Sequence, residues 1–277
     1  MLRELVNKSV YVLREAFAQI PPERIAVLWS TGKDSTLTLW LLKQAFFGEI
    51  PCKVLFIDTS VHYKEIYEFR DALADEWGFR DKLVVLRNEE ALSSGYPKPD
   101  RVEDCCLRLK VDPLKQTVEV LDLKALIVSI RRDENAVRRR ERYISPRDRD
   151  FKWHYYDQPA ELLGWGIVDL DLDVPHYRIH PLLHWTEVDV WRATKQYRLP
   201  FNPLYRADYV EQAYGVTGVR FRSLGCRPCT LPVVSTASSI DEIIREVLEK
   251  PGLERSGRAQ DKEETQTMLF LKHLGYL

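Results

Sequence analysis

The first apolar residues of the chain recur at every third or fourth position, which predicts an amphipathic helix. They are Leu5, Val6, Val10, Leu13 and Phe17. Pro21 and Pro22 end that pattern, and a compact apolar run over 24–29 then predicts a buried strand. Helical spacing returns after a polar turn at 30–35 and continues to Gly48. The chain therefore begins with a helix, a strand and a second helix.

Strands and helices continue to alternate as far as residue 130. We expect strands over 53–57, 83–86 and 125–130, and helices over 63–77 and 107–121. This alternation predicts an α/β protein with a doubly wound, mostly parallel sheet. Ligands of such sheets bind at the carboxyl ends of the strands, so Ser30, Asp58 and Ser129 are expected to face one crevice.

The remainder of the chain is expected to hold a lid, one more strand and two more helices. Residues 131–153 are rich in Arg and Asp and predict a long loop or lid. A strand is expected over 177–182, and a helix over 186–197 that opens with a T-E-V-D capping pattern. The last predicted helix covers 240–249.

Composition and charge restrict the classes of partner. The 277 residues are 45% hydrophobic, enough for one large core. Lys and Arg number 41 against 42 Asp and Glu, so the net charge of −1 gives no overall attraction to nucleic acid or anionic membranes. No stretch approaches the roughly 20 apolar residues of a membrane span. We therefore expect a cytoplasmic protein.

The polar turn between the first strand and the second helix has the chemistry of a phosphate site. Its sequence from Trp29 to Thr36 is W-S-T-G-K-D-S-T, which places backbone N-H groups and a helix N-terminus around an oxyanion. Gly32 permits close approach and Lys33 adds positive charge. The spacing is not that of a Walker A loop. An ordinary polar turn is the alternative interpretation.

The S-x-G-K-D-S string after a strand resembles the pyrophosphate loop (PP-loop) of the ATP pyrophosphatase superfamily, whose members cleave ATP between its α- and β-phosphates. Within it the chain is similar to the small subunit of bacterial sulfate adenylyltransferase and to the adenylylsulfate and phosphoadenylylsulfate reductases. The resemblance continues through segments 56–59, 67–71, 131–134, 141–142, 181–191, 220–226 and 254–277. It implies a nucleotide-binding α/β domain over 1–217 and a Cys-containing tail with helices over 218–277.

The resemblance also implies roles for individual residues. The nucleotide would bind at Ser30, Thr31, Gly32, Lys33, Asp34, Ser35, Asp58, Arg138 and Arg142. The catalytic groups would be Lys33, Asp34, Arg131 and Arg132. Asp34 would orient Mg²⁺ or the loop itself, and the arginines would clamp phosphate or sulfate oxygens. Arg139 and Arg140 are expected to face solvent.

The cysteines indicate metal or redox chemistry, because an adjacent pair and a C-x-x-C occur in a chain expected to be cytosolic. The pairs are Cys105 with Cys106 and Cys226 with Cys229, and Cys52 is expected to be a core thiol. The four paired cysteines resemble the cluster-binding pattern of the adenylylsulfate reductases, which implies a [4Fe-4S] cluster. Tetrahedral zinc and unligated thiols are the alternatives.

The predicted activity is conversion of ATP and sulfate to adenylylsulfate and pyrophosphate, with a GTPase large subunit as partner. One alternative is an iron-sulfur-dependent sulfurtransferase in DNA phosphorothioation or RNA thiolation, with a sulfur-donor protein as partner. A second is a reductase that uses an external thiol, because the reductases carry a nucleophilic Cys in a terminal E-C-G segment and no Cys follows Cys229. A third is a nucleotide-binding redox sensor.

Overall fold

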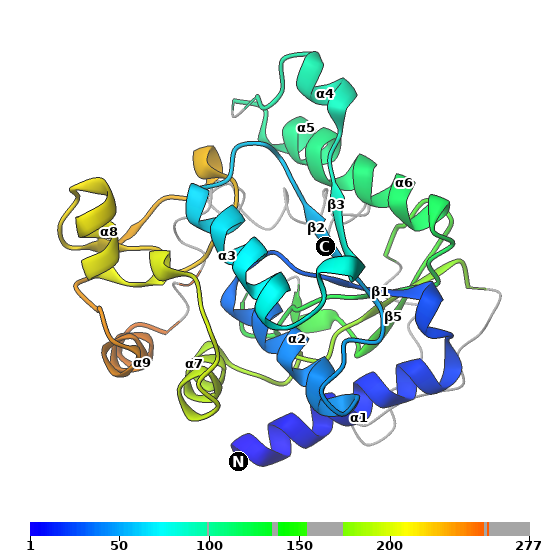
Figure 1. The fold of residues 1–277 in the computed structure, drawn as a ribbon, viewed down its shortest axis with the longest axis horizontal. Coiled ribbons are helices and arrows are strands. Elements are labelled where there is room, and N and C mark those ends of the chain that lie inside the picture. Colours follow the sequence, from blue (N-terminus) through cyan, green and yellow to red (C-terminus); the bar gives the residue numbers. More distant parts are fainter. Residues whose placement is uncertain (99, 135–137, 154–173, 252–253, 255–277) are drawn as a thin grey trace.

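The protein is built around a six-stranded sheet, seen in the computed structural model of Figure 1, which describes residues 1–98, 100–134, 138–153, 174–251 and 254. The strand order is β3-β2-β1-β4-β6-β5, and every neighbouring pair is parallel except β5 with β6. The strands are β1 Ile25–Leu28, β2 Lys53–Ile57, β3 Leu83–Leu86, β4 Ala125–Ile127, β5 Ile144–Arg147 and β6 His176–Ile179. The predicted doubly wound, mostly parallel sheet is confirmed.

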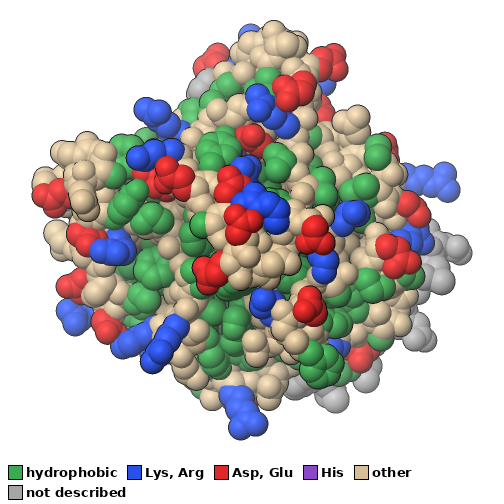
Figure 2. Space-filling model, viewed as in Figure 1, with side chains coloured by type: hydrophobic (Ala, Val, Ile, Leu, Met, Phe, Trp, Pro, Cys, Tyr) green, Lys and Arg blue, Asp and Glu red, His purple; other side chains and the backbone are tan. Residues whose placement is uncertain are grey.

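Helices flank the sheet, and in Figure 1 the strands lie between α1 and α2 on one side and α5 and α6 on the other. The helices in the described residues are α1 Leu2–Gln19, α2 Lys33–Ala45, α3 Lys64–Glu76, α4 Glu89–Ser93, α5 Val102–Cys106, α6 Asp112–Val120, α7 Glu187–Gln196, α8 Ala207–Tyr214 and α9 Ile240–Glu249. A small antiparallel pair is formed by β7 Val219–Arg220 and β8 Val233–Val234. Charges of both signs alternate over the face shown in Figure 2, in keeping with the balanced composition.

The sheet explains where a site must lie. All residues of β1 and β4 are buried, as expected for central parallel strands covered on both faces. The chain leaves β1 toward β2 on one side and later returns to β4 on the other, so the strand order reverses between β1 and β4. A crevice forms at such a reversal, outside the carboxyl ends of the strands. The turn after β1 and Ser129 after β4 both lie there.

Two predictions for the middle of the chain were wrong in part. Residues 131–153, predicted to be a loop, contain β5, which pairs antiparallel with β6 at the sheet edge. Its polar side chains concealed it, because Arg147 is buried through a 3.0 Å ion pair with Glu141. The helix predicted over 107–121 starts earlier, at Val102, and contains a π-helical segment Leu107–Val111.

Helix α7 begins as the T-E-V-D pattern predicts. Thr186 Oγ1 accepts a hydrogen bond from Asp189 N at 3.2 Å, and the Asp189 carboxylate accepts one from Thr186 N at 3.1 Å. This reciprocal pair satisfies two N-H groups that a helix start leaves without partners. It also fixes the position of Glu187, whose N-H donates to Asp133 at 2.8 Å.

The described part of the predicted tail shares a second apolar core with the earlier chain. Phe221, Leu224 and Ile243 pack with Phe56 and Trp191 in this cluster. The division at residue 217 stays a prediction. No helix among the described residues is long and apolar enough to cross a membrane.

We predict that Thr186→Ala lowers the free energy of unfolding by about 1 kcal/mol, the usual effect of removing an N-cap hydroxyl. Urea unfolding of Thr186→Ser provides the matched control, because serine retains the capping oxygen. An alanine variant as stable as the wild type would show that the capping box contributes nothing to the fold.

Candidate functional site

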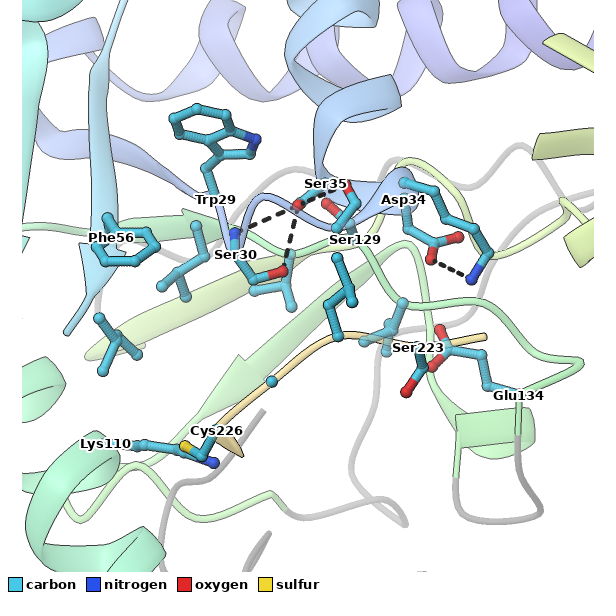
Figure 3. Close-up of a pocket in the computed structure, with 18 of the residues that line it drawn as sticks. Trp29, Ser30, Asp34, Ser35, Phe56, Lys110, Ser129, Glu134, Ser223 and Cys226 are labelled. Atoms are coloured by element: carbon cyan, nitrogen blue, oxygen red, sulfur yellow. Dashed lines mark hydrogen bonds and ion pairs between the residues drawn. The ribbon is translucent and has the colours of Figure 1, made fainter. Parts of the chain in front are cut away.

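A pocket opens at the carboxyl ends of β1, β2 and β4, and Figure 3 shows the labelled residues around it. The lining comes from the turn after β1, the ends of β2 and β4, the π-helical segment before α6, and the loop 223–226. Its open space, mouth included, is about 1250 Å³. The pocket lies where the strand order reverses, which is where open α/β sheets bind their ligands.

The turn after β1 leads directly into α2. Thr31 adopts a left-handed backbone conformation (φ 62°) that reverses the chain, and Gly32 then serves as the N-cap of α2 without a side-chain capping bond. A Cβ at Gly32 would meet Ser30 Oγ at 3.4 Å and Tyr205 Oη at 3.5 Å. Such a Cβ would make ordinary contacts, so the space does not exclude a side chain here. Helix α2 presents the positive end of its dipole to the pocket.

Two hydroxyls stiffen this turn. Ser35 Oγ accepts a hydrogen bond from Ser30 N at 3.2 Å and lies 3.2 Å from Ser30 Oγ, as the dashed lines of Figure 3 show. It also donates to Gly32 O at 3.1 Å. The loop is thus held in shape by its own residues before any ligand arrives.

Two buried cationic side chains lie at the loop, and both pair with Asp34. The side chains of Lys33 and Arg131 are 1% and 0% exposed. Asp34 forms an ion pair with each of them, and so does Glu254. Burial disfavours the charged form of Lys33, but Glu254, Tyr205 and Glu187 together outweigh this effect, and the pKa of Lys33 lies above its ordinary value. The same balance raises the pKa of Arg131. Both groups therefore stay positive at neutral pH.

A second layer of contacts positions Lys33. Tyr205 Oη accepts a hydrogen bond from Lys33 N at 3.1 Å, and Arg222 O lies 3.5 Å from Lys33 Nζ. Arg222 is in turn fixed by Glu187, with Nη2 to Oε2 at 2.8 Å. Burial, and then the negative charge of Glu254, raise the pKa of Glu187. Lys33 is thus linked to Arg222, and through Arg222 to Glu187 of α7.

These second-layer residues were missed in the sequence. Tyr205, Glu187, Arg222 and Glu254 are far from the loop along the chain, and an aromatic or an acidic residue alone does not indicate a phosphate site. Glu187, Arg222 and Glu254 do fall inside segments that carry the family resemblance, but that resemblance assigned them no role.

The structure brings only part of the predicted residue set to the pocket. Ser30, Gly32, Lys33, Asp34, Ser35 and Arg138 line it, and Arg131 contacts it through Asp34. Thr31, Asp58, Arg132 and Arg142 are absent from the lining. The Asp58 carboxylate instead accepts hydrogen bonds from Ser60 N and Tyr67 Oη, both at 2.8 Å, and holds the turn after β2.

The remaining arginines have other contacts. Arg132 Nη2 donates to Glu141 O at 3.0 Å and its guanidinium lies over the Tyr143 ring. Arg138 is buried beside Glu134, with which it forms an ion pair. Arg139 and Arg140 are exposed, as expected. Of this arginine group, Arg131 and Arg138 are therefore the two best placed for a phosphate.

The four paired cysteines surround a small cavity beside the pocket. Cys105, Cys106, Cys226 and Cys229 all line it. Thr59, Lys110 and Cys226 line both spaces, and Figure 3 shows Lys110 and Cys226 together at one end of the pocket. Lys110 Nζ lies 3.6 Å from Cys106 Sγ. The cysteine cavity therefore adjoins the candidate nucleotide site.

The thiols themselves are buried, and burial raises the pKa of Cys229 to about 11. Within the described ranges, no group of three or more Cys, His, Asp or Glu forms an arrangement that could hold a metal ion. Cys52 lies in the main apolar core, as predicted, where burial raises the pKa of its thiol to about 12.

Solved structures share this fold. The FMN adenylyltransferase of Candida glabrata superposes with a TM-score of 0.58 at 18% identity, over 94% of this chain and 88% of that one. The phosphoadenylyl-sulfate reductase of Candida auris gives a TM-score of 0.52 at 16% identity, over 78% and 90%. At such identities the likeness concerns the fold alone.

Sequence relatives identify the family. Residues 24–232 match the phosphoadenosine phosphosulfate reductase domain. Sulfate adenylyltransferase subunit 2 of Vibrio cholerae serotype O1 is 32% identical over 99% of this chain and 97% of its own length. The subunit 2 of Pseudoalteromonas translucida is 33% identical over 99% and 98%. The chain therefore belongs to the phosphoadenosine phosphosulfate reductase domain family, together with the sulfate adenylyltransferase subunit 2 proteins.

Proposed function

We propose that this chain catalyses the reaction of ATP with sulfate to form adenylylsulfate and pyrophosphate. The observation that carries the proposal is the pair of buried cations, Lys33 and Arg131, behind a stiff loop at the start of α2. The relatives named sulfate adenylyltransferase subunit 2 match along nearly the whole chain, and their name indicates sulfate as the acceptor of the adenylyl group.

Each loop residue has its own role in binding the nucleotide. Ser30, Gly32 and Ser35 surround the β- and γ-phosphates with hydroxyl and backbone donors, and Lys33 neutralises their charge. A sulfate oxygen attacks the α-phosphorus, and the bond from the α-phosphorus to the bridging oxygen of pyrophosphate breaks. No side-chain nucleophile is needed, because sulfate is already ionised. The buried guanidinium of Arg131 stabilises the negative charge that develops on the leaving pyrophosphate.

Mg²⁺ would enter this pocket with the nucleotide, because the carboxylates there already pair with Lys33, Arg131 or Arg138. Asp34, Glu134 and Glu254 line it with carboxylate oxygens, the ligands that Mg²⁺ prefers. Asp34 would hold the ion, whose contribution is to neutralise the phosphates. Arg138 would contact the nucleotide directly, since it lines the pocket. For Thr31, Asp58, Arg132 and Arg142, a direct contact with the nucleotide remains the sequence-based prediction.

A second subunit follows from the names of the relatives, which describe a subunit 2. The family reaction is uphill in the direction of adenylylsulfate, and this chain has no Walker A loop. We therefore propose a larger GTPase chain as the partner, as the resemblance implies.

A second candidate function has one observation in its favour. The four cysteines adjoin the nucleotide pocket and share Cys226 and Lys110 with it. A sulfurtransferase that adenylates its target and then delivers sulfur would need such a neighbour. The identity of the relatives over the whole chain favours sulfate as the acceptor.

For the cysteine cavity we propose a [4Fe-4S] cluster, with Cys105, Cys106, Cys226 and Cys229 as ligands. The support is the number and type of ligands, because four cysteines line one cavity, and their side chains would have to move closer together to hold the cluster. When bound, the cluster would fasten the segment at 226–229 to α5 and add a redox centre.

We predict that Lys33→Met lowers the rate of the reaction by about 100- to 1,000-fold, the usual effect of removing one preorganised group that stabilises developing charge. Methionine fills a similar buried volume, and Asp34 and Glu254 keep Arg131 as a partner. The assay should run downhill, from adenylylsulfate and pyrophosphate to ATP and sulfate, with ATP detected by luminescence.

The control for this assay is Lys43→Ala, at the other end of α2, where the side chain contacts Trp77 O instead of the pocket. It should retain the wild-type rate. Near-normal turnover in Lys33→Met would remove the phosphate loop from the mechanism. Thiol-dependent release of sulfite from adenylylsulfate, with no ATP formed, would make the protein a reductase.

We also predict that protein purified without oxygen contains about four iron atoms per chain, as one [4Fe-4S] cluster requires. Cys226→Ser should lose most of this iron and its visible absorption, whereas Cys52→Ser should keep both, because Cys52 lies in the main core. Stoichiometric zinc without iron, or equal iron in the two variants, would reject the assignment.

A further inference from the structure

Glu254 occupies the part of the pocket where the cations converge. One carboxylate oxygen bonds to Lys33 Nζ and the other to Arg131 Nη2. The residue is 8% exposed and lies 221 positions from Lys33 in the sequence, beyond the end of α9. A carboxylate that bridges a lysine and an arginine has the shape and charge of an oxyanion between its donors.

The surroundings of Glu254 are unfavourable to a second negative charge. Asp34 already pairs with both cations, and Glu187 is close enough that the charge of Glu254 raises the pKa of Glu187. Lys33 and Arg131, one at each carboxylate oxygen, compensate the charge of Glu254. A phosphate group carries more charge and more acceptor oxygens, so it is the stronger ligand for the same pair.

We propose that Glu254 is a built-in competitor of the nucleotide, whose carboxylate must leave Lys33 and Arg131 before the β- and γ-phosphates bind. This inference rests on the proposed function, because it names the regulation of that phosphate site. Without ligand, Glu254 neutralises two buried cations that would otherwise be poorly compensated. The need to displace Glu254 lowers the apparent affinity for phosphate ligands, since only the fraction of molecules with Glu254 displaced is competent to bind.

The proposal makes opposite predictions for the ligand-free and the ligand-bound protein. Removing the Glu254 charge should destabilise the ligand-free protein, because Lys33 and Arg131 lose a partner. It should tighten ligand binding, because nothing has to be displaced. At saturating pyrophosphate, wild type and variant should melt closer together, since Glu254 has left the cations in both.

Titration calorimetry with inorganic pyrophosphate tests the first consequence, using wild type, Glu254→Gln and Glu254→Ala. Glu249→Gln is the matched control, because it removes the same charge from an exposed position at the end of α9. We expect both Glu254 variants to bind pyrophosphate about tenfold more tightly, and the control to bind as wild type does. Melting curves with and without pyrophosphate should show the convergence.

Weaker binding by the Glu254 variants would overturn the proposal and make Glu254 part of the binding site. Equal binding in all four proteins would also overturn it. If no protein binds pyrophosphate, the phosphate site itself fails and the proposed function fails with it. If the expected order of affinities appears but adenylylsulfate and pyrophosphate give no ATP, the proposed function fails while the role of Glu254 stands.

Discussion

Burial of two positive charges at one edge of the sheet is the constraint on which the rest of the site depends. Lys33 and Arg131 have almost no exposed surface, so each must be compensated inside the protein. Removing one partner of such a buried pair typically costs about 3–5 kcal/mol. In the ligand-free protein, Asp34 and Glu254 compensate these charges. In the nucleotide complex, phosphate oxygens would do so. Nucleotide binding in this pocket would therefore replace a carboxylate by a phosphate as the partner of the two cations.

The sheet topology makes the arrangement possible. Reversal of strand order between β1 and β4 opens a crevice, and the loop after β1 and the segment after β4 supply Lys33 and Arg131 from its two sides. Later parts of the chain complete the site. Tyr205 Oη accepts a hydrogen bond from Lys33 N, and Arg222 O lies near Lys33 Nζ. The cysteine cavity lies next to this pocket because Cys226 follows Arg222 by only four residues.

Much of the fold was predictable because apolar spacing reports burial directly. The strands at 53–57 and 83–86 and the helix at 240–249 have their predicted bounds. Strand β5 was missed because Arg147 is buried by an ion pair and a hydrogen bond, which the spacing of apolar residues does not reveal. The turn between β1 and α2 was predictable because its sequence signal is local, and its binding of phosphate stays a prediction. Glu187 and Glu254 were not, since a carboxylate becomes part of an anion site only when folding places it beside two cations.

The central claim is that a sulfate oxygen attacks the α-phosphorus of ATP in this pocket. It is tested most directly with sulfate labelled in all its oxygens with ¹⁸O, in a reaction pulled forward by inorganic pyrophosphatase and supplied with the partner subunit if one is required. We expect adenylylsulfate whose α-phosphorus shows the ³¹P isotope shift of a single ¹⁸O in the bridge to sulfur. Formation of ADP and phosphate, or of AMP without the label, would contradict it.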